Sequence, residues 1–299
     1  MQNYAGKVAV ITGAGSGFGL EVARVAAQRG MQLVLLDVQP DALEQAKQEL
    51  QPAMARVVDV ANANEMQAVA NDVRAQFGAP NFVFNNAGVG SGGLVWESSQ
   101  FDWEWVLGVN FMGVVHGVRL FTPMMLAAEQ ADVNFEGHIV NTASMAGLVN
   151  APNMGVYNAS KAAVVALSET LYHDLALVSQ RVHCSLLCPF YVPTGIYRSE
   201  RNRPDELRES SSVTTVSQRV AQASTAQAVN KGRLSAQDVA QMVFAAMSEK
   251  QFYVFSHPQA LSSVKTRMQD VLDLRNPTNP LADKPEILQA LRKAINSET

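Results

Sequence analysis

Short apolar runs alternate along the chain with longer segments in which apolar residues recur every three or four positions. The runs that predict strands are KVAVIT, MQLVLLD, ARVVDV, NFVFNN, HIVNTAS, RVHCSLLCP and QFYVFS. The segments with helical spacing cover residues 17–29, 40–50, 62–76, 102–129, 155–179 and 235–248. Because the strands show almost no polar alternation, we expect both faces of the sheet to be covered, which indicates parallel strands. The order predicts an α/β, doubly wound Rossmann fold of about seven parallel strands with helices on both faces.

Two segments interrupt this alternation. Residues 190–230 are rich in Arg, Ser, Thr and Gln, and a connection of that length predicts a lid or mobile segment over a substrate. After about residue 257 the chain has helical patterns near 258–274 and 285–296, separated by NPTNPLADKP. We therefore expect one Rossmann domain over residues 1–256 and a C-terminal helical extension over 257–299.

Composition and charge exclude several classes of protein. With 299 residues and 47% hydrophobic composition, the chain can build a large α/β core. Its net charge is −4 and no basic run exceeds a pair of residues, so we expect no nucleic-acid partner. The first apolar run follows no basic leader, and no apolar stretch approaches about 18 residues. We expect neither a signal peptide nor a membrane span.

Cysteine and histidine usage points to a reduced protein without a metal. Cys184 and Cys188 lie four residues apart in a predicted strand, where both side chains share a face but lie too far apart for an easy disulfide. Free thiols suit a cytoplasmic location. The histidines show no spacing typical of metal ligands, so we predict no metal site. They are His116, His138, His173, His183 and His257.

A glycine-rich loop follows the first predicted strand. It reads Thr12-Gly13-Ala14-Gly15-Ser16-Gly17-Phe18-Gly19 and leads into a helix. Small residues let backbone N–H groups approach a pyrophosphate, and the helix N-terminus adds positive partial charge. A plain glycine turn is the alternative, but the strand before it and the helix after it favour a nucleotide. The predicted cofactor contacts here are Gly13, Gly15, Ser16, Gly17, Phe18 and Gly19.

An acidic residue ends the second predicted strand. Asp37 can accept hydrogen bonds from ribose hydroxyls, and its charge would repel a 2′-phosphate. The two residues after it offer no cation, so the sequence favours NAD over NADP. Asp37 could instead cap the next helix, although Pro40 and Asp41 suit that start better. Asp59 and Val60, after the third strand, are predicted to contact the adenine.

The pair Tyr157 and Lys161, in VYNASKAAVV, predicts proton transfer. Residues at i and i+4 share one helix face, and a lysine ammonium beside a phenol lowers the tyrosine pKa towards neutrality. Ser144 lies thirteen residues earlier and could hold a substrate oxygen. A buried tyrosine with a solvated lysine would share the spacing, but the other motifs favour catalysis. Asn110 breaks an apolar helical pattern, which predicts a functional site or close packing.

With these residues, the chain resembles the classical short-chain dehydrogenase/reductase (SDR) family over roughly residues 5–256. The family's TGxxxGxG falls on Thr12–Gly19, and its NNAG falls on Asn85–Gly88. Its catalytic residues fall on Asn110, Ser144, Tyr157 and Lys161. Further cofactor contacts implied by the resemblance are Asn86, Ala87, Gly88, Tyr157, Lys161, Pro189, Val192 and Thr194.

The resemblance also carries expectations about assembly and the proton path. It implies that Asn110 kinks its helix and holds a water linking Lys161 to solvent. It also implies that helices 102–129 and 155–179 pair with their copies in a homotetramer. One position departs from the family: Phe190 stands where a glycine usually follows the proline, which predicts a reshaped substrate pocket.

Together these features predict an NAD-dependent oxidoreductase that interconverts a hydrophobic or aromatic secondary alcohol and its ketone. Tyr157 is the expected general acid/base, and Lys161 also binds the nicotinamide ribose. The predicted substrate pocket comprises Leu94, Trp96, Ser144, Met145, Leu148, Met154, Phe190, Tyr191 and Tyr197.

Two alternatives share the scaffold. An epimerase would resemble TGxxGxxG, which Ser16 contradicts, and an enoyl reductase would have a longer Tyr-to-Lys spacing. A non-catalytic NAD-sensing protein would be expected to lack part of the catalytic set, which is complete here. The expected partner is a small-molecule alcohol or ketone.

Overall fold

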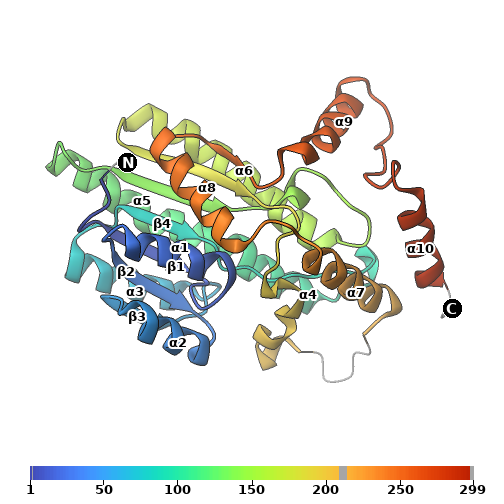
Figure 1. Ribbon diagram of the computed structural model, residues 1–299, viewed down its shortest axis with the longest axis horizontal. Helices are drawn as coiled ribbons and strands as arrows, with labels where there is room; N and C mark the ends of the chain where they lie inside the picture. Colours follow the sequence, from blue (N-terminus) through green and yellow to red (C-terminus); the bar gives the residue numbers. More distant parts are fainter. Residues whose placement is uncertain (2, 209–213, 297–299) are drawn as a thin grey trace.

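The computed structural model describes residues 1, 3–208 and 214–296. Across these residues, seven strands form one sheet in the order β3-β2-β1-β4-β5-β6-β7, and every pair is parallel (Figure 1). The strands are β1 (Val8–Thr12), β2 (Gln32–Asp37), β3 (Met54–Val57), β4 (Phe82–Asn85), β5 (Gly137–Thr142), β6 (Val182–Cys188) and β7 (Tyr253–Phe255). The strand order reverses between β1 and β4, where a doubly wound sheet binds its ligand. The predicted fold class is confirmed.

Helices cover both faces of this sheet (Figure 1). They are α1 (Gly17–Gln28), α2 (Pro40–Leu50), α3 (Ala63–Phe77), α4 (Gln100–Leu107), α5 (Gly113–Ala131), α6 (Gly155–Val178), α7 (Val216–Asn230), α8 (Ala236–Glu249), α9 (Leu261–Leu272) and α10 (Pro285–Asn296). One core cluster joins α1, α2 and α8 to the sheet, and a second joins α3, α5 and α6 to the other face.

The strands follow the period of two that a sheet imposes. In β1, Ala9 and Ile11 pack into the cluster under α1 and α8, whereas Val8 and Val10 pack into the cluster under α3 and α5. Every residue of β1 is therefore apolar or, at Thr12, hydrogen-bonded, because neither face meets water. In β6, both cysteines are buried and free, as expected.

The helix expected over 102–129 is one helical stretch with a defect. α4 passes through a π-helical turn, η2 (Gly108–Met112), into α5. Among the described residues, the stretch Gln100–Ala131 is long and apolar enough to cross a membrane. The expectation that no stretch reaches that length is therefore wrong. Half of its most apolar window is buried, because it packs as a core helix.

The segment over 190–230 differs from the prediction. It holds the 3₁₀ turns η4 (Gly195–Asn202) and η5 (Asp205–Leu207) and then α7, which the sequence reading missed. α7 begins with a capping box between Thr215 and Gln218, so its start is stabilised despite its polar composition. Part of the predicted lid, residues 209–213, lies outside the described residues.

The C-terminal extension contains α9 and α10, close to the predicted bounds. Residues 297–299, which the predicted extension includes, lie outside the described residues, as does residue 2 of the predicted domain. In Figure 1, α10 stands on the far side of α7 from the sheet, and the two helices are in contact.

Candidate active site

The glycine-rich loop is tied to the end of β4 by Thr12. Its Oγ1 accepts hydrogen bonds from the backbone N–H groups of Asn86 and Ala87, at 2.8 and 3.0 Å. Gly13 has a φ of +65°, and a Cβ there would lie 3.0 Å from Ala87 Cα. At Gly19 a Cβ would meet the carbonyl oxygen of Gly13 at 2.0 Å. Glycine is therefore required at both positions, and the TGxxxGxG pattern has a steric cause.

The start of α1 is open to an anion. No side chain caps it, whereas α4, α7 and α8 each begin with a capping box. Its first turn carries no acidic residue. Gly13, Ser16, Gly17 and Phe18 line the adjoining cavity, so the exposed N–H groups and the helix dipole face that space. This geometry suits the pyrophosphate of a dinucleotide.

Asp37 fixes the shape of the loop and also faces the cavity. Its carboxylate accepts hydrogen bonds from Gly15 N at 2.8 Å and from Gln39 N at 2.9 Å. Gln39, not Asp37, is the cap position of α2, and Pro40 is the first helical residue. The helix-cap alternative for Asp37 is therefore excluded, and the side chain remains at the cavity wall.

Asn110 is fully buried in the π-helical turn. Its Oδ1 accepts from Val89 N at 2.8 Å, and its Nδ2 donates to Val89 O at 3.0 Å and to Ser160 Oγ at 3.1 Å. The amide thus connects the loop after β4 to Ser160 of α6, the residue immediately before Lys161. A distorted helix at this position agrees with the implied kink, since π turns cluster at functional sites.

Lys161 is buried, with only 2% of its surface exposed. Its ammonium donates to Thr142 O at 2.9 Å and lies 5.8 Å from the centre of the Tyr157 ring. Gly88 lies close to it, since a Cβ at Gly88 would be in ordinary van der Waals contact with Lys161 Nζ at 3.5 Å. Burial lowers the pKa of Lys161 to about 8, so the neutral amine is accessible near physiological pH.

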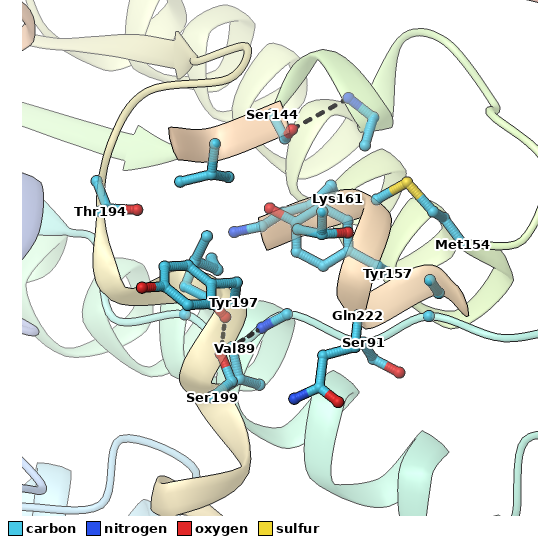
Figure 2. A pocket seen from close by; sticks show the side chains of 18 of the residues that line it. Val89, Ser91, Ser144, Met154, Tyr157, Lys161, Thr194, Tyr197, Ser199 and Gln222 are labelled. Atoms are coloured by element: carbon cyan, nitrogen blue, oxygen red, sulfur yellow. Dashed lines mark hydrogen bonds between the residues drawn. The ribbon is translucent and has the colours of Figure 1, made fainter. Parts of the chain in front are cut away.

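Tyr157 lies beside Lys161 and Ser144 at the centre of the site (Figure 2). Burial raises the pKa of Tyr157 to about 12, and a hydrogen bond with Ser144 opposes that shift. Desolvation of the phenolate therefore outweighs the lowering of the tyrosine pKa that was expected from Lys161. Ser144 Oγ also accepts from Ala146 N at 3.1 Å, which orients the hydroxyl.

A family model described as short chain dehydrogenase matches residues 7–205. The chain belongs to the short-chain dehydrogenase family. It is 30% identical over 278 residues to the CLA biosynthesis dehydrogenase/reductase of Lactiplantibacillus plantarum, covering 91% of this chain and 95% of that protein.

Other relatives extend over nearly the whole chain. The C alpha-dehydrogenase of Sphingobium sp. strain SYK-6 is 28% identical over 291 residues, covering 96% of this chain and 91% of that protein. A solved short-chain dehydrogenase/reductase from Burkholderia phymatum, in complex with NAD, is 50% identical with a TM-score of 0.89. The match covers 94% of this chain and all of that one. This short-chain dehydrogenase is accordingly an oxidoreductase that acts on CH–OH groups.

The cavity of this dehydrogenase measures about 1540 Å³, which is larger than the roughly 300–1,000 Å³ of a typical ligand pocket. It has room for a dinucleotide and a substrate together. Among the residues predicted from sequence, those that line it are Gly13, Ser16, Gly17, Phe18, Asp37, Asp59, Val60, Asn86, Ala87, Gly88, Ser144, Met145, Met154, Tyr157, Lys161, Pro189, Phe190, Tyr191, Val192, Thr194 and Tyr197. Residues from six separate loops therefore meet here, at the carboxyl ends of the strands.

Several predicted contacts are not at the cavity. Trp96 is 77% exposed, and neither it nor Leu94 lines the cavity wall. Leu148 is buried in a core cluster behind the site. These three residues, predicted to form the pocket, are therefore not among those that line the cavity in this structure. Gly15 and Gly19 are also set back from it, and they act by close packing of the loop.

Phe190 lines the cavity and has neighbours that the sequence did not indicate. Its ring is 4.5 Å from that of Tyr191 and 5.9 Å from that of His257, at the start of the extension. Its backbone N–H donates to Ser256 Oγ at 2.9 Å. The residue that departs from the family pattern therefore packs between the catalytic site and the C-terminal extension.

Sequence reasoning missed two groups of site residues. The first is Thr142 and Ser160, which hydrogen-bond to Lys161 and Asn110, and the available signal was that each lies next to a catalytic motif. The second is α7, which lines the cavity together with α10. Within residues 1, 3–208 and 214–296, no group of three His, Cys, Asp or Glu side chains could hold a metal ion.

Proposed function

We propose that this dehydrogenase interconverts a hydrophobic or aromatic secondary alcohol and its ketone, with NAD as cofactor and Tyr157 as the general acid/base. The observation that carries the proposal is the convergence of Tyr157, Ser144 and Lys161 on one wall of the cavity that also exposes the uncapped start of α1 (Figure 2). A protein that only sensed the dinucleotide would have no use for a buried lysine behind a tyrosine.

The residues divide the proton chemistry between them. Bound nicotinamide dinucleotide supplies the hydride acceptor or donor. Ser144 Oγ holds the substrate oxygen, and Tyr157 takes the proton from an alcohol or returns it to the forming alkoxide. Lys161, which is held by Thr142 O, stabilises the phenolate. It can also release a proton, because burial lowers its pKa to about 8. Asn110 keeps the loop after β4 against α6, which holds these groups in register.

The cofactor preference rests on Asp37. Its carboxylate lines the cavity and would meet a 2′-phosphate with like charge, whereas ribose hydroxyls can donate to it. The solved relative from Burkholderia phymatum holds NAD, which supports this choice. Val58, Asp59 and Val60 line the same end of the cavity and are suited to the adenine.

The substrate class rests on the walls around Tyr157. Met145, Met154 and Tyr191 are large and apolar or aromatic, and Tyr197 faces the site from the opposite side in Figure 2. A relative named C alpha-dehydrogenase supports oxidation at a carbinol carbon. We also propose the division into residues 1–256 and 257–299, a cytoplasmic location in keeping with the buried free thiols, and a homo-oligomer, either a tetramer or a dimer.

Substitution of Tyr157 tests the chemistry. Tyr157→Phe keeps the ring and removes the proton-transferring oxygen, so kcat for a secondary alcohol should fall about 10²–10⁴-fold. NADH binding, followed by its fluorescence, should persist. Ser144→Ala should likewise spare cofactor binding, whereas Lys161→Met should weaken it. Turnover of Tyr157→Phe within a few-fold of the unmodified enzyme would exclude the role given to Tyr157.

A further inference from the structure

The cavity continues past the catalytic residues into the space between α7 and α10. On the α10 side it is lined by Ile287, Ala290, Leu291 and Ala294. Their spacing of three, four and seven places them on one face of the helix. On the α7 side the lining is mixed and includes Val220, Gln222, Thr225 and Ala228. A channel with an apolar stripe on its α10 wall therefore joins the C-terminal extension to the site that holds Tyr157.

The apolar stripe of α10 is incompletely covered. The helix packs against α7, yet none of its described residues is buried, and Ile287 is 46% exposed. An amphipathic helix gains stability when its apolar face leaves water. Here the uncovered part of that apolar face lines the cavity. A bound molecule with apolar surface can therefore complete the burial of this face.

The C-terminal extension is hydrogen-bonded to a loop that adjoins the catalytic residues. From α9, Arg267 donates to Leu148 O at 3.1 Å, in the loop between Ser144 and Tyr157. The linker to α10 folds back because Asp270 accepts from Thr278 N at 2.8 Å and pairs with Arg275 at 3.1 Å. The extension is thereby held at a defined position relative to the catalytic groups.

The opposite wall, α7, is fixed in the same manner. Ser217 is 1% exposed, and its Oγ donates to Glu97 at 2.5 Å and accepts from Leu94 N at 2.9 Å. Its carbonyl oxygen accepts from Asn153 Nδ2 at 3.0 Å. Both walls are thus anchored to the loops on either side of the reacting centre.

We propose that the C-terminal extension forms a wall of the substrate site, and that the α10 stripe binds an apolar arm of the substrate remote from the carbinol carbon. This inference rests on the proposed function, and it narrows the substrate to an elongated secondary alcohol or ketone. The substrate, not a second copy of the chain, is the occupant, because the stripe is continuous with the cavity that contains Tyr157.

A homologous series of 2-alkanols tests the proposal. The kcat/KM of the unmodified enzyme should rise with chain length from 2-butanol to 2-decanol, by up to about fourfold per methylene group buried. In Leu291→Gln the ratio of kcat/KM for 2-decanol to that for 2-butanol should fall about tenfold. The matched control is Leu288→Gln, the same substitution on the same helix at a residue that does not line the cavity, and it should keep the ratio.

Binding of 2-methyl-2-decanol by calorimetry separates this proposal from the proposed function. A tertiary alcohol has no hydrogen on its carbinol carbon, so it reports binding along the α10 stripe without turnover. Tight binding that Leu291→Gln weakens, in an enzyme that oxidises no secondary alcohol, would contradict the proposed function and support the channel. Equal effects of Leu291→Gln and Leu288→Gln, or an unchanged dependence of kcat/KM on chain length in Leu291→Gln, would overturn the proposal that the α10 stripe binds the substrate. So would a change in the mass measured by light scattering with the length dependence intact, which would make the stripe a subunit contact.

Discussion

Tyr157 and Lys161 show that the environment of a side chain decides its chemistry as much as its spacing does. The four-residue spacing places the two groups on one face of α6, as predicted. Their burial, however, moves both groups towards their neutral forms, raising the pKa of Tyr157 to about 12 and lowering that of Lys161 to about 8. The spacing of two residues in the sequence predicts which face of the helix their side chains share. The local dielectric around those side chains depends on residues scattered along the chain, so the spacing does not predict it.

The pH dependence of the two reaction directions follows from Tyr157. Alcohol oxidation needs the phenolate, so its kcat/KM should rise with pH between about pH 7 and 10. Ketone reduction needs the protonated phenol, so its kcat/KM should stay level at low pH and fall only in the alkaline range. Steady-state profiles in both directions, with Lys161→Met for comparison, measure this. Full oxidation activity already at pH 6 would contradict the raised pKa.

Asp37 is expected to determine cofactor choice. Asp37→Asn removes the charge at nearly constant shape, so the preference for NAD over NADP in kcat/KM should shrink, mainly because NAD binds less well. The amide oxygen can still accept from Gly15 N or Gln39 N, so the loop should stay folded. Asp41→Asn, in the first turn of α2, is the matched control. If both variants alter the preference equally, the effect is not specific to Asp37.

At the scale of elements, β5 and β6 carry an acid-sensitive contact. His138 and His183 are register partners on these strands, and His138 Nε2 lies 2.8 Å from Ser185 Oγ. Burial lowers the pKa of His138 to about 3, aided by His183, the Met1 ammonium and Lys250. Between the unfolded value near 6.5 and about 3, the unfolded chain binds a proton that the folded chain excludes.

Stability should therefore fall as pH drops below about 6.5. Urea unfolding at pH 7 and pH 5 should show a loss that is smaller in His138→Phe, which cannot titrate, than in the unmodified protein. The exposed His173→Phe serves as the control and should keep the full loss. A pH dependence of the same size in all three proteins would show that other groups cause it.

Elements defined by their own periodicity were predictable, and those defined by tertiary contacts were not. The strands and most helices of the Rossmann sheet follow apolar patterns, and they appear within a few residues of the predicted bounds. α7 has a polar sequence and depends on Ser217 and on its capping box, so no local pattern distinguished it from a loop. The π turn around Asn110 likewise needs its partners Val89 and Ser160.

The same distinction applies to the site. Catalytic and cofactor residues sit at strand ends, which a parallel topology brings to one edge, so their gathering could be predicted. The direction of a loop side chain depends on the whole fold, and so Leu94, Trp96 and Leu148 were misplaced.

The anchoring of α7 can be tested at Ser217. Ser217→Ala removes the bonds to Glu97 and Leu94, and an unsatisfied buried group costs about 1–3 kcal/mol. α7 should become more sensitive to limited proteolysis, and substrate KM should rise while NADH affinity stays constant. Asn230→Ser, at the exposed end of α7, should change neither quantity. Unchanged proteolysis of Ser217→Ala would exclude the anchoring role.

At the scale of the whole molecule, the extension and the cofactor site occupy different ends of one cavity. Removal of residues 276–299 deletes α10 but keeps α9 and its bond from Arg267 to Leu148. The truncated protein should bind NADH with unchanged affinity and lose most of its advantage for long substrates. Light scattering on the same sample reports the subunit number. Unchanged kinetics and unchanged mass would show that α10 has neither role.

The two cysteines of the chain lie on β6, between β5 and the edge strand β7, and both are buried. Burial raises the pKa of each thiol to about 12, so almost no thiolate is available to an electrophile in the folded state. A thiol reagent can modify them only after β6 separates from its neighbours. The modification rate at neutral pH therefore measures how often β6 separates from β5 and β7, without any introduced label.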